Sequence, residues 1–319
     1  MYSSIKPNTK FFIQVDRTHK LYIEECGNKK GVPVVYLHGG PGGSISAKNR
    51  RLFNPKKYWI ILFDQRGSGK SKPSKSIINN STNKLIDDME KIRGYLKIKK
   101  WLIVGGSWGS TLALTYSIKN PAKVLGLILR GIFLGTKEEA SWAFNDSAKF
   151  FYPEIINEIK KKINKNKKNN IFLELGKMLE SKNQNKNTLG ASIWNKYERI
   201  LSVLNPGKIN LKKIVNYPIT KKENLPNSPF LEWHYIKNNF FIKKNHIFSG
   251  LKKIKKIPTI IIQGRYDLIC PPKSAFLVAQ NLSNCDLRII ESSGHASSEE
   301  KIQFNLIKAI NEIYQKIKK

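Results

Sequence analysis

A short glycine-serine tract follows an apolar run in the first half of the chain, and it constrains the fold more than any other feature. Residues 101–104 (W-L-I-V) are typical of a short buried strand, and residues 111–116 (T-L-A-L-T-Y) of the apolar start of a helix. Between them stands G-G-S-W-G, residues 105–109, with Ser107 at its centre. A chain that reverses so tightly needs residues without a Cβ on both sides of the turn. The tract therefore predicts a sharp strand-to-helix turn that presents the hydroxyl of Ser107 at the carboxyl edge of a sheet.

The remaining apolar runs predict an α/β fold with a mostly parallel central sheet and helices on both faces. The runs alternate with helix-like segments, and their near-continuous hydrophobicity is typical of strands covered on both sides. Between residue 134 and about residue 245 this alternation of strand-like and helix-like segments ends, and the sequence becomes rich in lysine and asparagine with helical periodicity. We expect a core domain of residues 1–134 and 246–319, with a mainly helical cap of residues 135–245 inserted in it. The expected strands are 34–37, 59–63, 101–104, 124–129, 259–262 and 287–290.

Composition excludes several classes of protein. No stretch approaches 18 uncharged apolar residues, and the first residues contain no apolar leader, so we expect a cytoplasmic protein without a membrane span. The three cysteines, Cys26, Cys270 and Cys285, lack C-x-x-C spacing, which fits a reducing compartment. The five histidines are scattered and form no H-E-x-x-H motif. We therefore expect no metal and no other cofactor.

The charge of the chain is strongly positive. It carries 57 lysines and arginines against 23 aspartates and glutamates, a formal net charge of +34. The cations are spread over the whole chain among asparagines and isoleucines, and no nucleic-acid-binding motif accompanies them. We interpret the excess as a bias of composition and expect no specific nucleic-acid partner, only weak and salt-sensitive adhesion to polyanions.

An aspartate and a histidine stand where an activated serine needs them. A serine that attacks a carbonyl requires a base to take its proton and an acid to orient that base, and on this type of sheet they follow in the order Ser, Asp, His. Asp267 comes just after the expected strand 259–262, and His295 just after 287–290. Taken singly, Asp267 could cap the helix that begins near Pro272, and His295 could be an ordinary loop residue. Together with Ser107 they predict a catalytic triad and a hydrolase that works by acyl transfer.

Two backbone N–H groups must stabilise the oxygen anion that forms in such a reaction. One is expected from Trp108, the residue after the nucleophile. The other is expected from H-G-G-P-G-G, residues 38–43, where glycines let the backbone approach a substrate. We favour Gly40 over Gly39 for this role, and an ordinary strand-to-loop turn remains the alternative for the loop. We interpret His38 as a structural residue.

Five tracts together resemble the proline iminopeptidases, which are serine peptidases of the α/β-hydrolase fold. The resemblance implies a serine aminopeptidase that releases N-terminal proline from small peptides through an acyl-enzyme. A general carboxylesterase or amidase of the same fold is the alternative. The sequence predicts no oligomeric state. The five tracts are H-G-G-P-G-G (38–43), D-Q-R-G-S-G-K-S (64–71), G-G-S-W-G-S-T-L-A-L (105–114), L-R-G-I-F (129–133) and G-R-Y-D (264–267).

The resemblance also implies a substrate site in the cap. An aminopeptidase must hold a protonated amine beside the carbonyl that it attacks, which calls for carboxylates. Glu198 and Glu232 match the family's amine-binding pair, and Phe133 is the expected apolar wall for a pyrrolidine ring. A general carboxylesterase has no use for this pair. Among the positions that depart from the family pattern, Phe230 replaces a usual arginine, and Ala143 stands where a tyrosine is expected.

Overall fold

A single sheet organises the molecule. The computed structural model describes residues 1–163, 170–215 and 225–317. Within these residues an eight-stranded sheet has the order β1-β2-β4-β3-β5-β6-β7-β8. β1 and β2 are antiparallel to their neighbours, and the strands from β4 to β8 are parallel. The strands are β1 (Thr9–Gln14), β2 (Lys20–Gly27), β3 (Val32–Leu37), β4 (Tyr58–Phe63), β5 (Trp101–Ser107), β6 (Val124–Ile132), β7 (Thr259–Gly264) and β8 (Cys285–Ile290).

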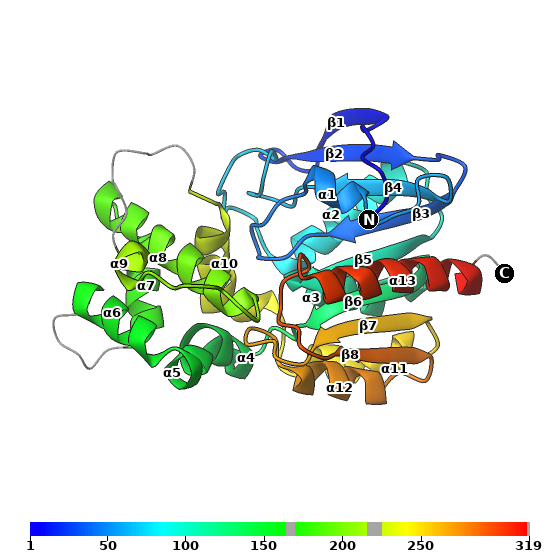
Figure 1. Ribbon diagram of the computed structural model, residues 1–319. Coiled ribbons are helices and arrows are strands. Elements are labelled where there is room, and N and C mark those ends of the chain that lie inside the picture. Colours follow the sequence, from blue (N-terminus) through cyan, green and yellow to red (C-terminus); the bar gives the residue numbers. More distant parts are fainter. Residues whose placement is uncertain (164–169, 216–224, 318–319) are drawn as a thin grey trace.

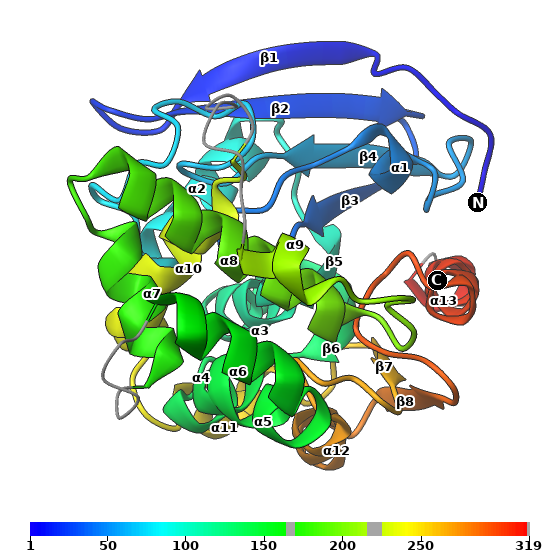
Figure 2. The ribbon, with the colours of Figure 1, turned by 60° about the vertical axis from the view of Figure 1, so that its left-hand side comes forward.

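Helices cover both faces of the sheet, and this explains the continuous apolar runs. In β4, Ile60 and Leu62 belong to the core under one face, while Trp59, Ile61 and Phe63 belong to the core under the other. Figure 2 shows α13 and α3 on opposite sides of β5 and β6. The helices of this part are α1 (Ala47–Arg50), α2 (Thr82–Tyr95), α3 (Trp108–Lys119), η1 (Pro121–Lys123), α11 (His246–Ile254), α12 (Pro272–Gln280) and α13 (Glu300–Ile317).

A group of helices lies between β6 and β7 in sequence and stands at one end of the sheet (Figure 1). Residues 164–169 and 216–224 of the expected cap lie outside the described residues. The proposed division at residues 134/135 and 245/246 stays a prediction. The helices of the group are α4 (Lys137–Ser141), η2 (Trp142–Asp146), α5 (Ser147–Phe151), α6 (Pro153–Ile163), α7 (Ile171–Leu179), α8 (Gln184–Ser202), α9 (Leu211–Val215), α10 (Ser228–Lys237) and η4 (Asn239–Phe241).

Apolar periodicity did not reveal β1 and β2. Two adjacent glutamates interrupt the apolar pattern of β2, yet both are buried. Glu24 accepts a hydrogen bond from Arg50 Nε at 2.8 Å, and Glu25 accepts one from Trp59 Nε1 at 2.8 Å. Their partners come from other elements, so the sequence of β2 alone cannot show that these charges are compensated.

None of the helices in the described residues is both long and apolar enough to cross a membrane. Within the same residues no group of three or more histidine, cysteine, aspartate or glutamate side chains is arranged to hold a metal ion.

Candidate active site

Ser107 occupies the predicted sharp turn between β5 and α3. Its backbone has φ 58° and ψ −128°, a conformation that side-chain-bearing residues seldom adopt. The glycines of the tract are needed because backbones approach closely here: a Cβ on Gly105 would collide with the carbonyl oxygen of Gly109, and one on Gly109 with that of Leu37. The helix begins at Trp108, directly after the serine. The predicted strand-to-helix turn is therefore present, and its glycines serve close packing.

Asp267 and His295 are brought together at the ends of β7 and β8. His295 Nδ1 lies 2.7 Å from Asp267 Oδ2, and both side chains are buried. The other carboxylate oxygen, Oδ1, accepts hydrogen bonds from the backbone N–H groups of Ile269 at 3.0 Å and Cys270 at 2.7 Å. Asp267 is thus fixed by its own loop, and it can fix the orientation of the imidazole in turn.

The imidazole of His295 lies over the end of β6, the strand next to that of Ser107. A Cβ added to Gly131 would lie 3.0 Å from His295 Cε1 and 3.3 Å from Asp267 Oδ2. The backbone of His295 is tied on two sides: its N–H donates to the carbonyl of Ser202 at 2.9 Å, and its carbonyl accepts from Arg130. Serine, aspartate and histidine therefore lie at the same edge of the sheet, although they are up to 188 positions apart in the chain.

The expected contact between Ser107 and His295 is not formed in this structure. The structure gives no hydrogen bond between the Ser107 hydroxyl and His295. Burial, with the nearby charges of Asp267 and Glu139, raises the pKa of the Cys270 thiol well above its usual value. Hydrogen bonds between catalytic groups are often long without substrate and tighten when it binds.

The glycine loop 38–43 lies against Ser107. A Cβ on Gly39 would be 3.4 Å from Ser107 Cβ, so the loop backbone passes directly beside the serine. Gly40 has φ +110°, and a Cβ there would lie 2.6 Å from the nitrogen of Gly42. The loop turns back on itself through a hydrogen bond from Gly43 N to Gly39 O at 3.2 Å. Gly39 makes the closer approach to the serine, and the oxyanion role of Gly40 stays a prediction.

Gln65 joins this loop to the turn at Ser107, a role that the sequence did not reveal. Its side-chain amide donates to His38 O at 2.9 Å, and its Oε1 accepts from Trp108 Nε1 at 2.9 Å. His38 Nε2 accepts the N–H of Gln65 at 3.0 Å, while Nδ1 lies 2.9 Å from Gly39 O. His38 is therefore structural, as expected. The tract 64–71 contains Gln65, but only the fold shows what the residue contacts.

Glu232 and Glu198 form a carboxylate pair in the cap helices. Glu232, on α10, is 2% exposed, and its Oε2 accepts a hydrogen bond from Trp194 Nε1 at 2.5 Å. Its Oε1 is buried without a hydrogen-bond partner. Burial and the nearby Glu198 raise the pKa of Glu232 well above its usual value, and burial raises the pKa of Glu198 to about 7. A buried carboxylate with a free oxygen and an acidic neighbour attracts a cation.

Phe133 lies beside α3. It is 7% exposed, and its ring centroid is 4.9 Å from that of Phe240. Its backbone is held by α3, because Thr111 Oγ1 donates to Phe133 O at 2.6 Å and Phe133 N donates to Ser110 Oγ at 3.2 Å. The ring is therefore a fixed apolar surface near Ser107.

The structure shows what surrounds Phe230 and Ala143, which depart from the family pattern implied by the resemblance. The ring of Phe230 lies under the ammonium group of Lys75, 4.5 Å from the ring centroid. A cation from the core thus lies against the position where the resemblance implies an arginine. Ala143 is buried in the cap with 3% exposure.

Comparison with known proteins places the chain in a family. A family model described as the alpha/beta hydrolase fold matches residues 32–302. A proline iminopeptidase of Arabidopsis thaliana is 38% identical over 310 residues, covering 97% of this chain and 80% of that protein. A proline iminopeptidase of Neisseria meningitidis serogroup B is 35% identical and covers 98% of both chains. The chain belongs to the proline iminopeptidase family of α/β hydrolases. The predicted family, fold class and peptidase activity are confirmed.

Solved structures agree with the family at the level of the fold. The crystal structure of a proline iminopeptidase of Mycobacterium smegmatis matches 97% of this chain and 99% of its own, with a TM-score of 0.65 and 15% identity. An esterase from Exiguobacterium antarcticum matches 96% and 99%, with a TM-score of 0.62 and 20% identity. Peptidases of this family and esterases therefore share the sheet, and the residues that surround it must determine the substrate.

Proposed function

We propose that this peptidase releases N-terminal proline from small peptides with a Ser107, Asp267, His295 triad. The observation that carries the proposal is the free, buried Oε1 of Glu232 beside Glu198, in a protein whose sheet edge holds Ser107 and the Asp267–His295 pair. Ester hydrolysis needs only the sheet edge. A buried anionic site in the cap is useful for a substrate that brings a cation.

His295 takes the proton of the Ser107 hydroxyl as the serine attacks the carbonyl of the N-terminal residue. Asp267 holds the imidazole by Nδ1 and stabilises the imidazolium that forms. The N–H groups of Trp108 and Gly40 stabilise the oxygen anion. His295 then gives its proton to the leaving amine. Finally, a water molecule, deprotonated by His295, hydrolyses the acyl-enzyme.

Glu232 and Glu198 bind the protonated amine of the substrate. Within the described residues no cationic side chain forms an ion pair with either glutamate, so the pair is available to a ligand. Phe133 packs against the pyrrolidine ring. The amine and the attacked carbonyl belong to the same residue, which limits the cleavage to the N-terminal position. The proposed substrates are small peptides with a free N-terminal proline, and a cytoplasmic location stays a prediction.

Hydrolysis of a panel of aminoacyl arylamides by the wild type and by Ser107→Ala tests the proposal. We expect a strong preference for proline and a loss of several orders of magnitude in the variant. Equal rates across the panel, with efficient hydrolysis of a simple p-nitrophenyl ester, would instead support a general carboxylesterase.

A further inference from the structure

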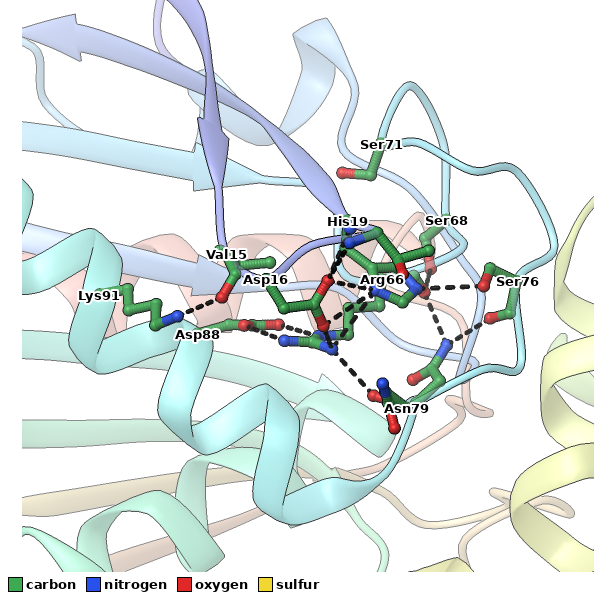
Figure 3. A network of polar contacts seen from close by, with 12 residues as sticks. Val15, Asp16, His19, Arg66, Ser68, Ser71, Ser76, Asn79, Asp88 and Lys91 are labelled. Atoms are coloured by element: carbon green, nitrogen blue, oxygen red, sulfur yellow. Dashed lines mark hydrogen bonds and ion pairs between the residues drawn. The ribbon is translucent and has the colours of Figure 1, made fainter.

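A largely buried ion cluster joins Asp16, in the turn after β1, to Arg66 and to Asp88 of α2 (Figure 3). Arg66, at its centre, is 3% exposed. Its guanidinium donates two hydrogen bonds to Asp88, at 2.6 and 2.7 Å, and one to Asp16 at 2.5 Å. Two carboxylates on one guanidinium in a fork geometry fix the position of the arginine backbone.

Asn80 is hydrogen-bonded to the backbone of this cluster. Its side-chain amide donates to the carbonyl of Arg66 at 3.1 Å and to that of Ser76 at 2.8 Å. The preceding residue is held as well, because Arg66 Nη1 donates to the carbonyl of Asn79 at 2.9 Å. Asn80 is 3% exposed, so its remaining polar atoms need partners in the protein.

Those partners come from the cap helix α10. The hydroxyl of Tyr235 donates to Asn80 Oδ1 at 2.7 Å, and Nε2 of His234 donates to the carbonyl of Asn80 at 2.8 Å. Glu232 lies three residues before Tyr235, one turn along the same helix. A single asparagine therefore joins the buried ion cluster to the helix that carries the proposed amine site.

Tyr235 also contacts the nucleophile turn. Its ring meets the indole of Trp108 edge-on, with 4.9 Å between ring centroids, and Trp108 follows Ser107. Tyr235 is 1% exposed. Its ring thus sets the distance of α10 from the turn, while its hydroxyl sets the rotation of α10 through Asn80.

We propose that Asn80 and Tyr235 are positioning residues that set the place of the Glu232 carboxylate relative to Ser107. The inference rests on the proposed aminopeptidase function. The amine and the carbonyl of one residue are separated by a single Cα atom, so a substrate fits only one separation of the two groups. A displacement of about 1 Å in such a site can cost on the order of 100-fold in rate.

Tyr235→Phe is the test, because it removes the hydroxyl and keeps the ring on Trp108. Tyr58→Phe is the matched control: it removes a buried tyrosine hydroxyl that donates to Ile310 O at 2.6 Å, under the other face of the sheet. We expect Tyr235→Phe to lower kcat/KM for proline arylamide by roughly 10- to 100-fold, mainly through KM. Hydrolysis of an ester without an amine should stay within about twofold of the control.

A purely structural role predicts a different pattern. Both substrates would then lose activity together, in proportion to the drop in Tm, and this result would overturn the inference. So would a Tyr235→Phe enzyme that matches Tyr58→Phe on proline arylamide.

Crystal structures of the wild type and Tyr235→Phe give a readout that needs no turnover. We expect the separation between the Glu232 carboxylate and Ser107 Oγ to change by about 1 Å, and an unchanged separation would contradict the inference. If the wild type cleaves no aminoacyl arylamide, the proposed function fails, and the crystallographic comparison still decides whether Tyr235 positions Glu232.

Discussion

Asp267 Oδ2 lies 2.7 Å from Nδ1 of His295, while its Oδ1 is occupied by two backbone N–H groups. The carboxylate is an acceptor in all of these contacts, so Nδ1 carries the proton and Nε2 is left free to act as a base. This single contact fixes both the tautomer and the direction of the imidazole.

Asp267→Asn should therefore lower kcat by about 10³- to 10⁴-fold with little change in fold, because an amide can donate to Nδ1 and favour the wrong tautomer. Steady-state kinetics with proline arylamide checks this. Asp286→Asn, which alters a surface ion pair with Arg288, is the control and should keep wild-type kcat. Similar rates for the two variants would argue against a role of Asp267 in catalysis.

Glu232→Gln should raise KM for substrates with a free amine by roughly 10- to 100-fold, since charge-assisted hydrogen bonds to the amine are lost. N-acetylated or amine-free esters should be hydrolysed as by the wild type. Glu154→Gln, at an exposed position of the cap, is the control. An equal loss on esters would show that Glu232 does not act through the amine.

Glu198 and Glu232 should make the protein without bound substrate less stable as the pH rises. The pKa of Glu198 is raised to about 7 in the folded protein, against 4.5 for an ordinary glutamate. Between these values the folded state binds a proton that the unfolded state has lost, so the free energy of unfolding falls with increasing pH. Glu198→Gln has no such proton, and relative to the wild type it should gain up to about 3 kcal/mol between pH 4.5 and pH 8. Urea denaturation at the two pH values measures this, and parallel pH dependence of the two proteins would contradict it.

Gly131→Ala should disturb His295. The backbone at Gly131 has φ +53°, and a Cβ would lie 3.0 Å from the imidazole. We expect a stability loss of about 1–2 kcal/mol from the backbone conformation, together with a fall in kcat as the imidazole is displaced. Gly94→Ala is the control, because a Cβ there meets nothing within 4 Å and Gly94 lies inside α2. That variant should be more stable by about 0.5–1 kcal/mol with unchanged kcat. Thermal unfolding and kinetics on both variants decide the matter.

The sequence predicts those parts of this protein whose causes are local. The turn at Ser107 follows from its glycines, and the parallel strands follow from runs that are buried on both faces. Asp267 and His295 were expected at one edge of the sheet because each follows a parallel strand, and the two side chains are in contact there. The hydrogen-bond partners of Glu24 and of Asn80 could not be predicted in this way, because each partner lies on an element that is distant in the sequence. Trp194 is a further example: nothing in its neighbourhood along the chain shows that its indole donates to Glu232, 38 positions away.

The insertion of the helical group between β6 and β7 affects when activity can arise during synthesis. Ser107 is translated before the helical group, whereas Asp267 and His295 follow β7 and β8, which are translated after it. A nascent chain that ends before residue 259 has a nucleophile without a base. On the proposed mechanism, the growing polypeptide cannot hydrolyse peptides until β7 and β8 have joined the sheet and have brought Asp267 and His295 to its edge.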